Sequence, residues 1–546
     1  MLGEFREGNV ELDAVIVGAG FSGLYALHKL RNEFGLNVQA FDKASGVGGT
    51  WYWNRYPGAR SDSESIVYSY TFDEELYKEW KWTERYPRQQ EILNYLNHVA
   101  DRYDLRRSIN FETGIDSAWF NDETNRWDIQ TDKGQLISAK YFICAVGLLS
   151  STNFPAIKGK ERFKGEMVHT SRWPKHEVAL KGKRVGVIGT GSTGVQLITE
   201  IAPIVEHLTV FQRTPQYSVP AQHGPISAQR IDAIVADVEE FRKSVRASLT
   251  GFGFEESKVP AMSVTPAERQ ATFEEAWKIG GGFRYLFAFS DIGTDPEANE
   301  VAASFVRDKI KSIVKNPETA RTLTPYDLYA KRPLCDGGYY ETFNRDNVSL
   351  VDVKRAPIRE ITEKGIRTDE GEHELDVLIF ATGFDAVTGN FFKIDIRGRN
   401  GVTLREKWSA GPKTYLGLAT AGFPNMFMVV GPVGPFTNQP PAIEVHVEWI
   451  AETVRRMQSQ NVATIDATPE AENDWMTTCV DHANTTLFTK VDSWINGANV
   501  EGKPKTVMFY MEGMKPYIER LAKVTDSGYA GFQIAHAQPA KRAAHG

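Results

Sequence analysis

The sequence predicts an α/β fold, and three features of the chain carry that prediction. Two apolar runs, residues 12–17 and 184–188, each end in a Gly-x-Gly-x-x-Gly loop that is followed by apolar residues at helical spacing. Residues 225–330 lack such runs and show helical patterns instead. We therefore expect two Rossmann-like dinucleotide-binding domains with a helical insertion.

Length and composition are typical of a globular protein with several domains. The chain has 546 residues, 41% hydrophobic and 24% charged, and its net charge of −7 argues against a nucleic-acid-binding surface. Its three cysteines, Cys144, Cys335 and Cys479, form no C-x-x-C pair, which favours a cytoplasmic location. No apolar run reaches the ~20 residues that cross a membrane. We expect a monomer without a membrane span, a secretory signal or a metal centre.

The first glycine loop, Gly18-Ala-Gly-Phe-Ser-Gly23, follows a strand and opens a helix, as dinucleotide binding requires. Gly18 allows the tight turn, Gly20 lets the backbone approach a pyrophosphate, and Gly23 lets helix and strand pack closely. Asp42 follows Gly23 by nineteen residues, where its carboxylate can bind a ribose diol. The position of the loop near the N-terminus favours FAD over NAD.

The second glycine loop, Gly189-Thr-Gly-Ser-Thr-Gly194, repeats this strand–loop–helix arrangement. Its second strand ends in Phe211-Gln-Arg-Thr214, so Arg213 stands where a ribose-binding acid would otherwise be. An arginine can form a bidentate pair with a 2′-phosphate, which an acid would repel. The pattern predicts NADP rather than NAD, with Lys331 as a second cation. An ordinary surface charge at Arg213 is the alternative.

Two further segments accompany the glycine loops. Residues 163–174 read F-x-G-x-x-x-H-x-x-x-W-P, and their His169 lies beside Thr170 and Ser171. This setting is more typical of a hydrogen-bonded structural histidine than of an acid–base catalyst. Residues 48–62 combine three aromatic residues with Arg-Tyr-Pro-Gly. This composition suits the wall of a flat ring system better than an ordinary aromatic core.

These segments resemble the identifying stretches of the type I Baeyer–Villiger monooxygenases, flavoenzymes that insert an oxygen atom next to a ketone carbonyl. The matching fingerprint positions are Phe163, Gly165, His169, Trp173 and Pro174, and a second family segment is matched by Gly49, Trp51, Tyr56, Pro57, Gly58 and Asp62. Residues 381–385 are similar to a third segment, which many two-dinucleotide flavoproteins share. Within the family, runs such as residues 259–263 and 330–335 are most similar to the cyclohexanone monooxygenases.

The resemblance implies FAD and NADPH as cofactors, dioxygen as co-substrate, and a cyclic ketone that is converted to a lactone through an FAD peroxide. Oxidation of sulfides is implied as well. Arg332 matches the family's active-site arginine, and Asp62 matches the carboxylate that orients it. An arginine stays charged even when partly buried and can stabilise a developing oxyanion. A purely structural salt bridge is the alternative for this pair.

The resemblance also implies the remaining site residues. The cofactor-binding set is Gly18, Gly20, Phe21, Gly23, Asp42, Lys43, Gly49, Thr50, Trp51, Asp62, Tyr68, Gly189, Thr190, Gly191, Ser192, Thr193, Gly194, Gln196, Arg213, Thr214, Lys331 and Trp494. The substrate pocket is Leu148, Leu149, Phe252, Phe283, Phe436, Thr437 and Phe509, with core packing as the alternative for each. Gln439 replaces a more usual apolar residue, which leaves the ring size of the ketone open.

Domain boundaries follow from the same motifs. We expect residues 1–150 and 384–546 to form the FAD-binding domain, and residues 151–224 and 331–383 to form the NADP-binding domain. Residues 225–330 would be a helical subdomain inserted in the latter, with a capping box at Thr265–Glu268. Residues 487–504 suit a mobile surface loop, and the tail after Gln538 is expected to be disordered. The family resemblance implies that this loop, which holds Trp494 and Asn499, covers NADP.

Three other functions are weighed against this prediction. A flavin monooxygenase of amines or sulfides is disfavoured by Trp173-Pro174 and Arg332. A flavin-dependent disulfide reductase would need a C-x-x-C pair. A non-catalytic dinucleotide sensor would not need the Arg332 and Asp62 pair. Neither H-E-x-x-H nor G-x-S-x-G occurs, so metalloprotease and serine-hydrolase chemistry have no support.

We expect Arg213→Ala to raise the KM for NADPH about tenfold or more, because the charge-assisted contact to the 2′-phosphate is lost. The KM for NADH should barely change, since that coenzyme has no such phosphate. Steady-state kinetics with both coenzymes measures the difference. An equal effect on the two coenzymes would remove Arg213 from coenzyme selection.

Overall fold

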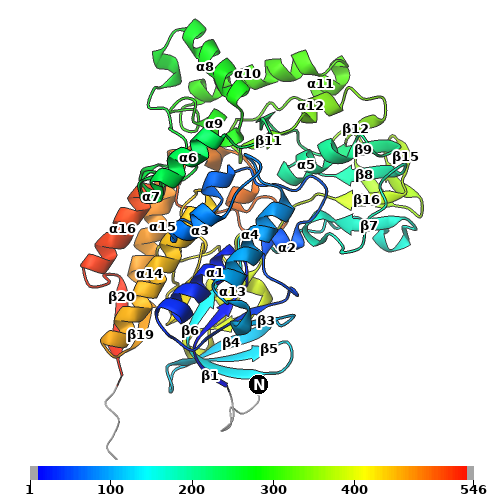
Figure 1. Cartoon of the computed structure of the whole chain (residues 1–546). Helices are drawn as coiled ribbons and strands as arrows, with labels where there is room; N and C mark the ends of the chain where they lie inside the picture. The colour runs from blue at the N-terminus through cyan, green and yellow to red at the C-terminus, as the bar shows by residue number, and fades with distance from the viewer. Residues whose placement is uncertain (1–9, 538–546) are drawn as a thin grey trace, which may run out of the picture.

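Two sheets rich in parallel strands organise the protein in the computed structural model, which describes residues 10–537 (Figure 1). One strand of each sheet runs into one of the glycine loops. Most helices of the insertion lie at the top of Figure 1, and its first two helices extend down the left side of the view. The α/β class with two dinucleotide-binding units and a helical insertion is confirmed. The tail predicted to be disordered, after Gln538, lies outside the described residues.

The first sheet has eight strands in the order β17-β4-β5-β6-β1-β2-β3, with β18 beside β6. The strands are β1 (Val10–Val17), β2 (Val38–Asp42), β3 (Ile109–Phe111), β4 (Ile115–Asn121), β5 (Arg126–Thr131), β6 (Leu136–Cys144), β17 (Asp395–Arg397) and β18 (Met426–Met428). Strand β1 lies between β2 and β6 and is parallel to both. Its Ala14, Val15 and Ile16 are fully buried, as expected for a strand covered on both faces.

The second sheet has five parallel strands in the order β12-β9-β8-β16-β7. They are β7 (Glu166–His169), β8 (Arg184–Ile188), β9 (His207–Gln212), β12 (Val348–Asp352) and β16 (Val377–Phe380). Three small sheets complete the strands of the described chain. One is a meander of β13 (Ile358–Ile361), β14 (Gly365–Thr368) and β15 (Gly371–Glu374). The others are a parallel pair of β10 (Ser218–Pro220) and β11 (Leu334–Asp336), and an antiparallel pair of β19 (Val462–Ala467) and β20 (Phe532–His536).

Between β10 and β11 the named elements of the described chain are all helical. They are α6 (Ala228–Ala236), α7 (Val238–Ala247), a 3-10 turn (Ala261–Ser263), α8 (Pro266–Ile279), α9 (Gly282–Leu286), α10 (Pro296–Ile313) and α11 (Pro317–Leu323). The predicted capping box is present, because Thr265 caps α8 and Glu268 bonds back to the Thr265 backbone. Because β10 and β11 pair with each other, the insertion leaves and returns at one place.

The other helices cover the first sheet or support the second. They are α1 (Phe21–Leu27), α2 (Thr50–Trp53), α3 (Glu74–Glu79), α4 (Gln89–Arg102), α5 (Ser192–Ile201), α12 (Tyr339–Thr342), α13 (Leu404–Lys407), α14 (Gln439–Ser459), α15 (Pro469–Asn484) and α16 (Met514–Asp526). Helix α1 is shorter than the sequence predicts, because residues 28–33 continue it as a π-helical stretch. Helices α1 and α14 pack on each other, side by side in Figure 1.

Two chain crossings join the regions of the two sheets, and they run side by side. Thr152 and Phe384 form an isolated antiparallel bridge. The Asn153 amide donates to the Gly383 carbonyl at 3.0 Å, and the Asp385 amide donates to the Ser151 carbonyl at 2.8 Å. The crossings therefore form one short hydrogen-bonded ribbon.

The predicted surface loop at residues 487–504 is packed onto this ribbon in the structure. It forms 3-10 turns at Leu487–Lys490 and Trp494–Asn496, with Ile495 only 2% exposed. The Lys503 ammonium donates to the Asp385 carboxylate at 2.6 Å and to the Ala386 carbonyl at 2.6 Å. Most apolar residues of the segment, among them Leu487 and Ile495, are buried in this packing.

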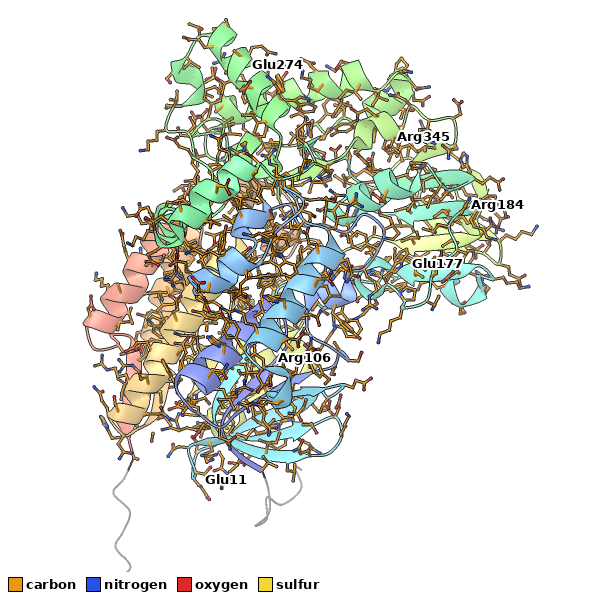
Figure 2. All side chains as sticks on the ribbon, viewed as in Figure 1. Glu11, Arg106, Glu177, Arg184, Glu274 and Arg345 are labelled. Carbon is orange, nitrogen blue, oxygen red and sulfur yellow. The ribbon has the colours of Figure 1, made fainter. Side chains whose placement is uncertain are left out.

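Charged side chains lie mainly on the outside of the molecule. Glu11 near the start of β1, Arg184 at the start of β8 and Glu274 on α8 extend from the periphery in Figure 2. Within residues 10–537, no helix is both long and apolar enough to cross a membrane.

We expect Gly194→Ala to destabilise the fold by about 2 kcal/mol, because the added methyl group would meet a backbone oxygen. A Cβ at this position would lie 2.2 Å from the Gly189 carbonyl oxygen. Gly191→Ala in the same loop is the matched control, since its Cβ would meet nothing within 4 Å and its φ is −78°. Urea unfolding of both variants measures the difference, and equal shifts would contradict the packing argument.

Candidate active site

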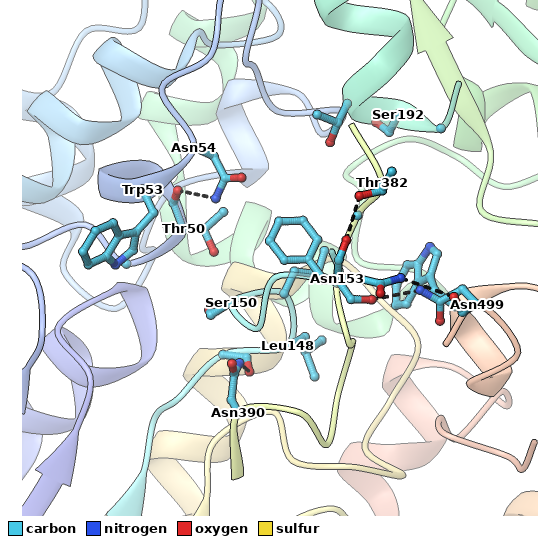
Figure 3. A pocket seen from close by; sticks show the side chains of 18 of the residues that line it. Thr50, Trp53, Asn54, Leu148, Ser150, Asn153, Ser192, Thr382, Asn390 and Asn499 are labelled. Carbon is cyan, nitrogen blue, oxygen red and sulfur yellow. Dashed lines mark hydrogen bonds between the residues drawn. The ribbon is translucent and has the colours of Figure 1, made fainter. Parts of the chain in front are cut away.

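Both glycine loops open into one cavity of about 1160 Å³ between the two sheets. Figure 3 shows part of its lining, with Thr50 and Asn54 from the α2 segment facing Ser192 at the start of α5. Of the predicted cofactor-binding residues, all except Gly23, Gly194 and Lys331 line this cavity. All seven predicted pocket residues line it as well.

The first glycine loop is held open by close backbone packing. Gly18 has a φ of +110°, and a Cβ there would lie 2.5 Å from the Ala145 carbonyl oxygen. The Asp42 carboxylate accepts the Ala19 and Ala44 amides, both at 2.7 Å, which fixes it at the end of β2. Burial raises its pKa, although these two hydrogen bonds oppose the shift. The acid thus lies beside the loop, as the sequence predicts.

The second glycine loop has more open space. A Cβ at Gly191 would meet nothing within 4 Å, so a phosphate can approach the backbone there. Arg213 is exposed and lines the cavity next to Thr214. Lys331 lies elsewhere, because its ammonium pairs with Asp327 and it does not line the cavity. The loop and Arg213 are therefore together, but the second predicted cation is not with them.

Arg332 and Asp62 form an ion pair between the two halves of the cavity. Arg332 Nη1 donates to Asp62 Oδ2 at 2.5 Å, and the Asp62 side chain is only 5% exposed. The same carboxylate accepts Ser192 Oγ at 3.0 Å and Gln196 Nε2 at 2.9 Å. Burial disfavours the charged guanidinium, but attraction by Asp62 outweighs it, so the pKa of Arg332 lies above its usual value.

Aromatic side chains form the wall of the cavity next to Arg332. Phe283 lies under the guanidinium at 5.6 Å and stacks on Phe252, with ring centroids 4.1 Å apart. Phe509 contacts Phe436 at 5.3 Å and Trp494 at 5.9 Å, both in edge-to-face geometry. A fixed positive charge thus faces a largely apolar space.

The two chain crossings and the 487–504 segment close another side of the cavity. Asn499 Nδ2 donates to the Phe384 carbonyl at 2.8 Å, and Asn153 Nδ2 donates to the Asn499 carbonyl at 3.3 Å. Thr382 Oγ1 donates to the Asn153 carbonyl at 2.7 Å, which is drawn in Figure 3. The Asn499 Oδ1 atom is buried and has no hydrogen-bond partner among the described residues. It is therefore available to a bound molecule.

None of the fingerprint residues lines the cavity. These residues are Phe163, Gly165, His169, Trp173 and Pro174. His169 ends β7 beside Phe380 of β16. Its Nδ1 accepts the Ser171 amide at 3.1 Å, and its Nε2 lies 3.1 Å from Thr382 Oγ1. Burial lowers the pKa of His169 to about 4, so the ring is neutral at physiological pH.

Sequence reasoning did not single out several polar residues that line the cavity. Arg172 stacks on Trp53, with its guanidinium 4.1 Å from the ring centroid, and both line the cavity. Asn390 donates to the Val146 and Gly147 carbonyls at 3.0 and 2.7 Å. Arg172 occupies a variable position of the fingerprint motif, so the motif itself gave no signal for it.

The cavity fits two dinucleotides. Each glycine loop has a glycine whose Cβ would clash with the backbone, and each opens a helix whose amides face the cavity. The orphaned Asn499 Oδ1 and the exposed Arg213 provide polar contacts that the protein itself leaves unused. The residues present are therefore suited to FAD at the first loop and to NADP at the second.

Comparison with known proteins agrees with this geometry. The family model of flavin-binding monooxygenase-like proteins matches residues 13–220. The chain is 54% identical to a Baeyer–Villiger monooxygenase of Pseudooceanicola batsensis over 96% of both chains. It is 51% identical to a phenazine N-monooxygenase of Lysobacter antibioticus, over 97% of this chain and 98% of that protein.

A solved structure is equally similar. The cyclohexanone monooxygenase of Rhodococcus sp. Phi1 bound to NADP+ matches with a TM-score of 0.96 and 56% identity. The match covers 97% of this chain and 100% of that one. With more than half of its residues identical to such relatives over nearly its whole length, this chain belongs to the Baeyer–Villiger monooxygenase family.

Proposed function

We propose that this enzyme uses FAD, NADPH and dioxygen to convert cyclic ketones of the cyclohexanone type to lactones. The observation that carries this proposal is the Arg332–Asp62 ion pair, which lies where the two glycine loops and the aromatic wall meet. A permanent cation facing an apolar space suits a reaction in which negative charge develops on a ketone oxygen. A protein that only bound dinucleotides would not need this arrangement.

Bound FAD and NADPH would supply hydride transfer and the activation of dioxygen. In the proposal, the first glycine loop and Asp42 bind FAD, and the second loop and Arg213 bind NADP. Trp494 and Asn499 would contact the nicotinamide side, which the unused Asn499 Oδ1 supports. Lys331 is proposed to reach the 2′-phosphate only after release of Asp327.

Arg332 would hold the developing oxyanion, and Asp62 would fix the orientation of its guanidinium. Because Asp62 also accepts Ser192 and Gln196 at the second loop, it would link the arginine to the position of NADP. The fixed charge needs no reorganisation during the reaction, which is the main source of such electrostatic stabilisation. Phe283 would exclude water from one face of the guanidinium.

The aromatic wall would define the ketone pocket. Phe252, Phe283, Phe436 and Phe509 offer apolar contacts to an alicyclic ring. Gln439 lines the same cavity, and its Nε2 donates to the Thr437 carbonyl at 3.1 Å. This internal hydrogen bond uses part of its polar capacity, so we propose that Gln439 tunes ring size rather than binding the carbonyl.

The proposal includes the domain boundaries, the oligomeric state and the location of the protein in the cell. Residues 1–150 and 384–546 would form the FAD domain, and residues 151–224 and 331–383 the NADP domain with its insertion at 225–330. We propose a cytoplasmic monomer. The free, buried state of Cys144, Cys335 and Cys479 supports a reducing compartment.

Oxygenation of nitrogen is the second candidate, because a relative at 51% identity is a phenazine N-monooxygenase. Oxidation of sulfides would use the same site. Nitrogen and sulfur lone pairs need no oxyanion stabilisation, so these reactions would depend less on Arg332.

A substrate panel tests the proposal. Purified enzyme with FAD and NADPH is incubated with cyclopentanone, cyclohexanone, a thioether and phenazine, and products are identified by mass spectrometry. We expect faster NADPH consumption and lactone with cyclohexanone. N-oxide formation without lactone would favour the second candidate, and a colourless protein that does not bind FAD would contradict both.

We expect Arg332→Ala to retain FAD but to lower lactone formation by about 100-fold or more, because the fixed oxyanion partner is lost. Arg332→Lys should recover only part of the rate, since lysine keeps the charge but not the planar contact with Asp62. The visible spectrum of bound FAD is the control for folding. Full ketone oxygenation by Arg332→Ala would remove this residue from the mechanism.

A further inference from the structure

One buried carboxylate near the cavity pairs with three arginines that come from separate segments. Glu64 Oε1 accepts Arg85 Nη2 at 2.8 Å and Arg284 Nη2 at 3.1 Å, and its Oε2 accepts Arg230 Nη1. The Glu64 side chain is only 5% exposed. We call Glu64, Arg85, Arg230 and Arg284 the Glu64 cluster. It lines a second, smaller cavity apart from the main one.

The three arginines also hold the backbone around them. Arg85 Nη1 donates to the Ile279 carbonyl at 2.7 Å, at the end of α8. Arg230 Nη2 donates to the Gly253 carbonyl at 3.0 Å. Arg284 stacks over Phe254 at 4.7 Å. The cluster therefore joins the segment of Glu64 and Arg85 to several parts of the helical insertion.

Three segments that meet at the cluster carry residues of the main cavity. Glu64 follows Asp62 by two positions, Arg284 directly follows Phe283, and Gly253 directly follows Phe252. The Glu64 segment is itself fixed, because the Ser65 amide donates to the Arg85 carbonyl at 2.8 Å. Glu64 thus connects the segment of Asp62, the partner of Arg332, to the segments that hold the stacked rings of Phe252 and Phe283.

We propose that Glu64 is a positioning residue, whose charge sets the distance between Asp62 with its bound Arg332 and the Phe252–Phe283 face of the ketone pocket. The inference rests on the proposed function, because it concerns the geometry of that pocket. Glu64 does not line the main cavity, so it acts through its neighbours.

This positioning role depends on the negative charge of Glu64. Three guanidinium groups converge on one carboxylate, and without its charge they would repel one another in a partly buried site. The arginines would then separate, and Phe283 and the Gly253 backbone would move with them. Displacements of about 1 Å in a reactive geometry can cost about 100-fold in rate.

Glu64→Gln tests the proposal, because it keeps the shape of the side chain and removes the charge. We expect FAD content, the visible spectrum and the rate of flavin reduction by NADPH to stay within about twofold of wild type. The lactone kcat/KM should fall about tenfold or more, with a raised ketone KM. The fraction of NADPH that yields lactone should fall, and hydrogen peroxide, formed from NADPH and dioxygen, should rise.

Glu448→Gln is the matched control. Glu448 accepts Arg242 at 2.6 Å and Arg246 at 2.8 Å, which join α7 of the insertion to α14, but it does not line the main cavity. A purely structural role for Glu64 predicts that both variants lose thermal stability and keep the wild-type ratio of lactone to peroxide. That result in Glu64→Gln would overturn the proposal.

Arg284→Gln provides a second test if Glu64→Gln does not fold, since it removes one arm and leaves two ion pairs on Glu64. We expect the lactone kcat/KM and the lactone-to-peroxide ratio to fall, but by less than in Glu64→Gln. An unchanged lactone-to-peroxide ratio would contradict the proposal. Different results would contradict the proposed function and the role of Glu64. A wild-type enzyme that makes no lactone from any ketone contradicts the proposed function, whereas normal coupling in the variants contradicts only the role of Glu64.

Discussion

The buried Asp62 carboxylate is the constraint on which the rest of the site depends. It comes from the segment that follows the first glycine loop, yet its partners are Arg332, beyond the helical insertion, and Ser192 and Gln196, beside the second loop. A buried carboxylate has to be satisfied by several donors, or its desolvation is too costly. Three parts of the chain are therefore held together where both glycine loops end.

The two sheets provide the rigid frame for this contact. Each glycine loop is set by close backbone packing against its own sheet, at Ala145 for the first and at Ala381 for the second. The aromatic wall comes from the insertion and from segments near the C-terminal end of the described chain. Position, charge and exclusion of water thus come from different regions, in keeping with the view that cofactors supply the hard chemistry and protein supplies the environment.

Local patterns predicted much of the fold. The strands at Arg184–Ile188 and Val377–Phe380 have the predicted bounds, because the interior of a buried parallel strand is largely apolar. The glycine loops could be predicted equally well, because the spacing of their glycines reflects backbone geometry. The mobility expected of residues 487–504 stays a prediction, and their composition did not reveal the ribbon on which they pack.

Contacts between residues far apart in the sequence were harder to predict. The Arg332–Asp62 pair was expected only through family resemblance, since 270 residues separate the partners. The Glu64 cluster left no signal at all, because glutamate and arginine are usually solvated surface charges. Its partners Arg230 and Arg284 are 166 and 220 residues from Glu64 in the sequence and meet it only in the folded protein.

The hydrogen-bonded ribbon at Thr152 and Phe384 determines how the two halves of the molecule can move. A pair of strands tied by backbone bonds resists sliding along its length but twists readily about its own axis. Relative motion of the halves would then be close to a one-axis swivel. The Lys503 contacts lie at one end of this ribbon, so the 487–504 segment would resist the swivel as long as they hold.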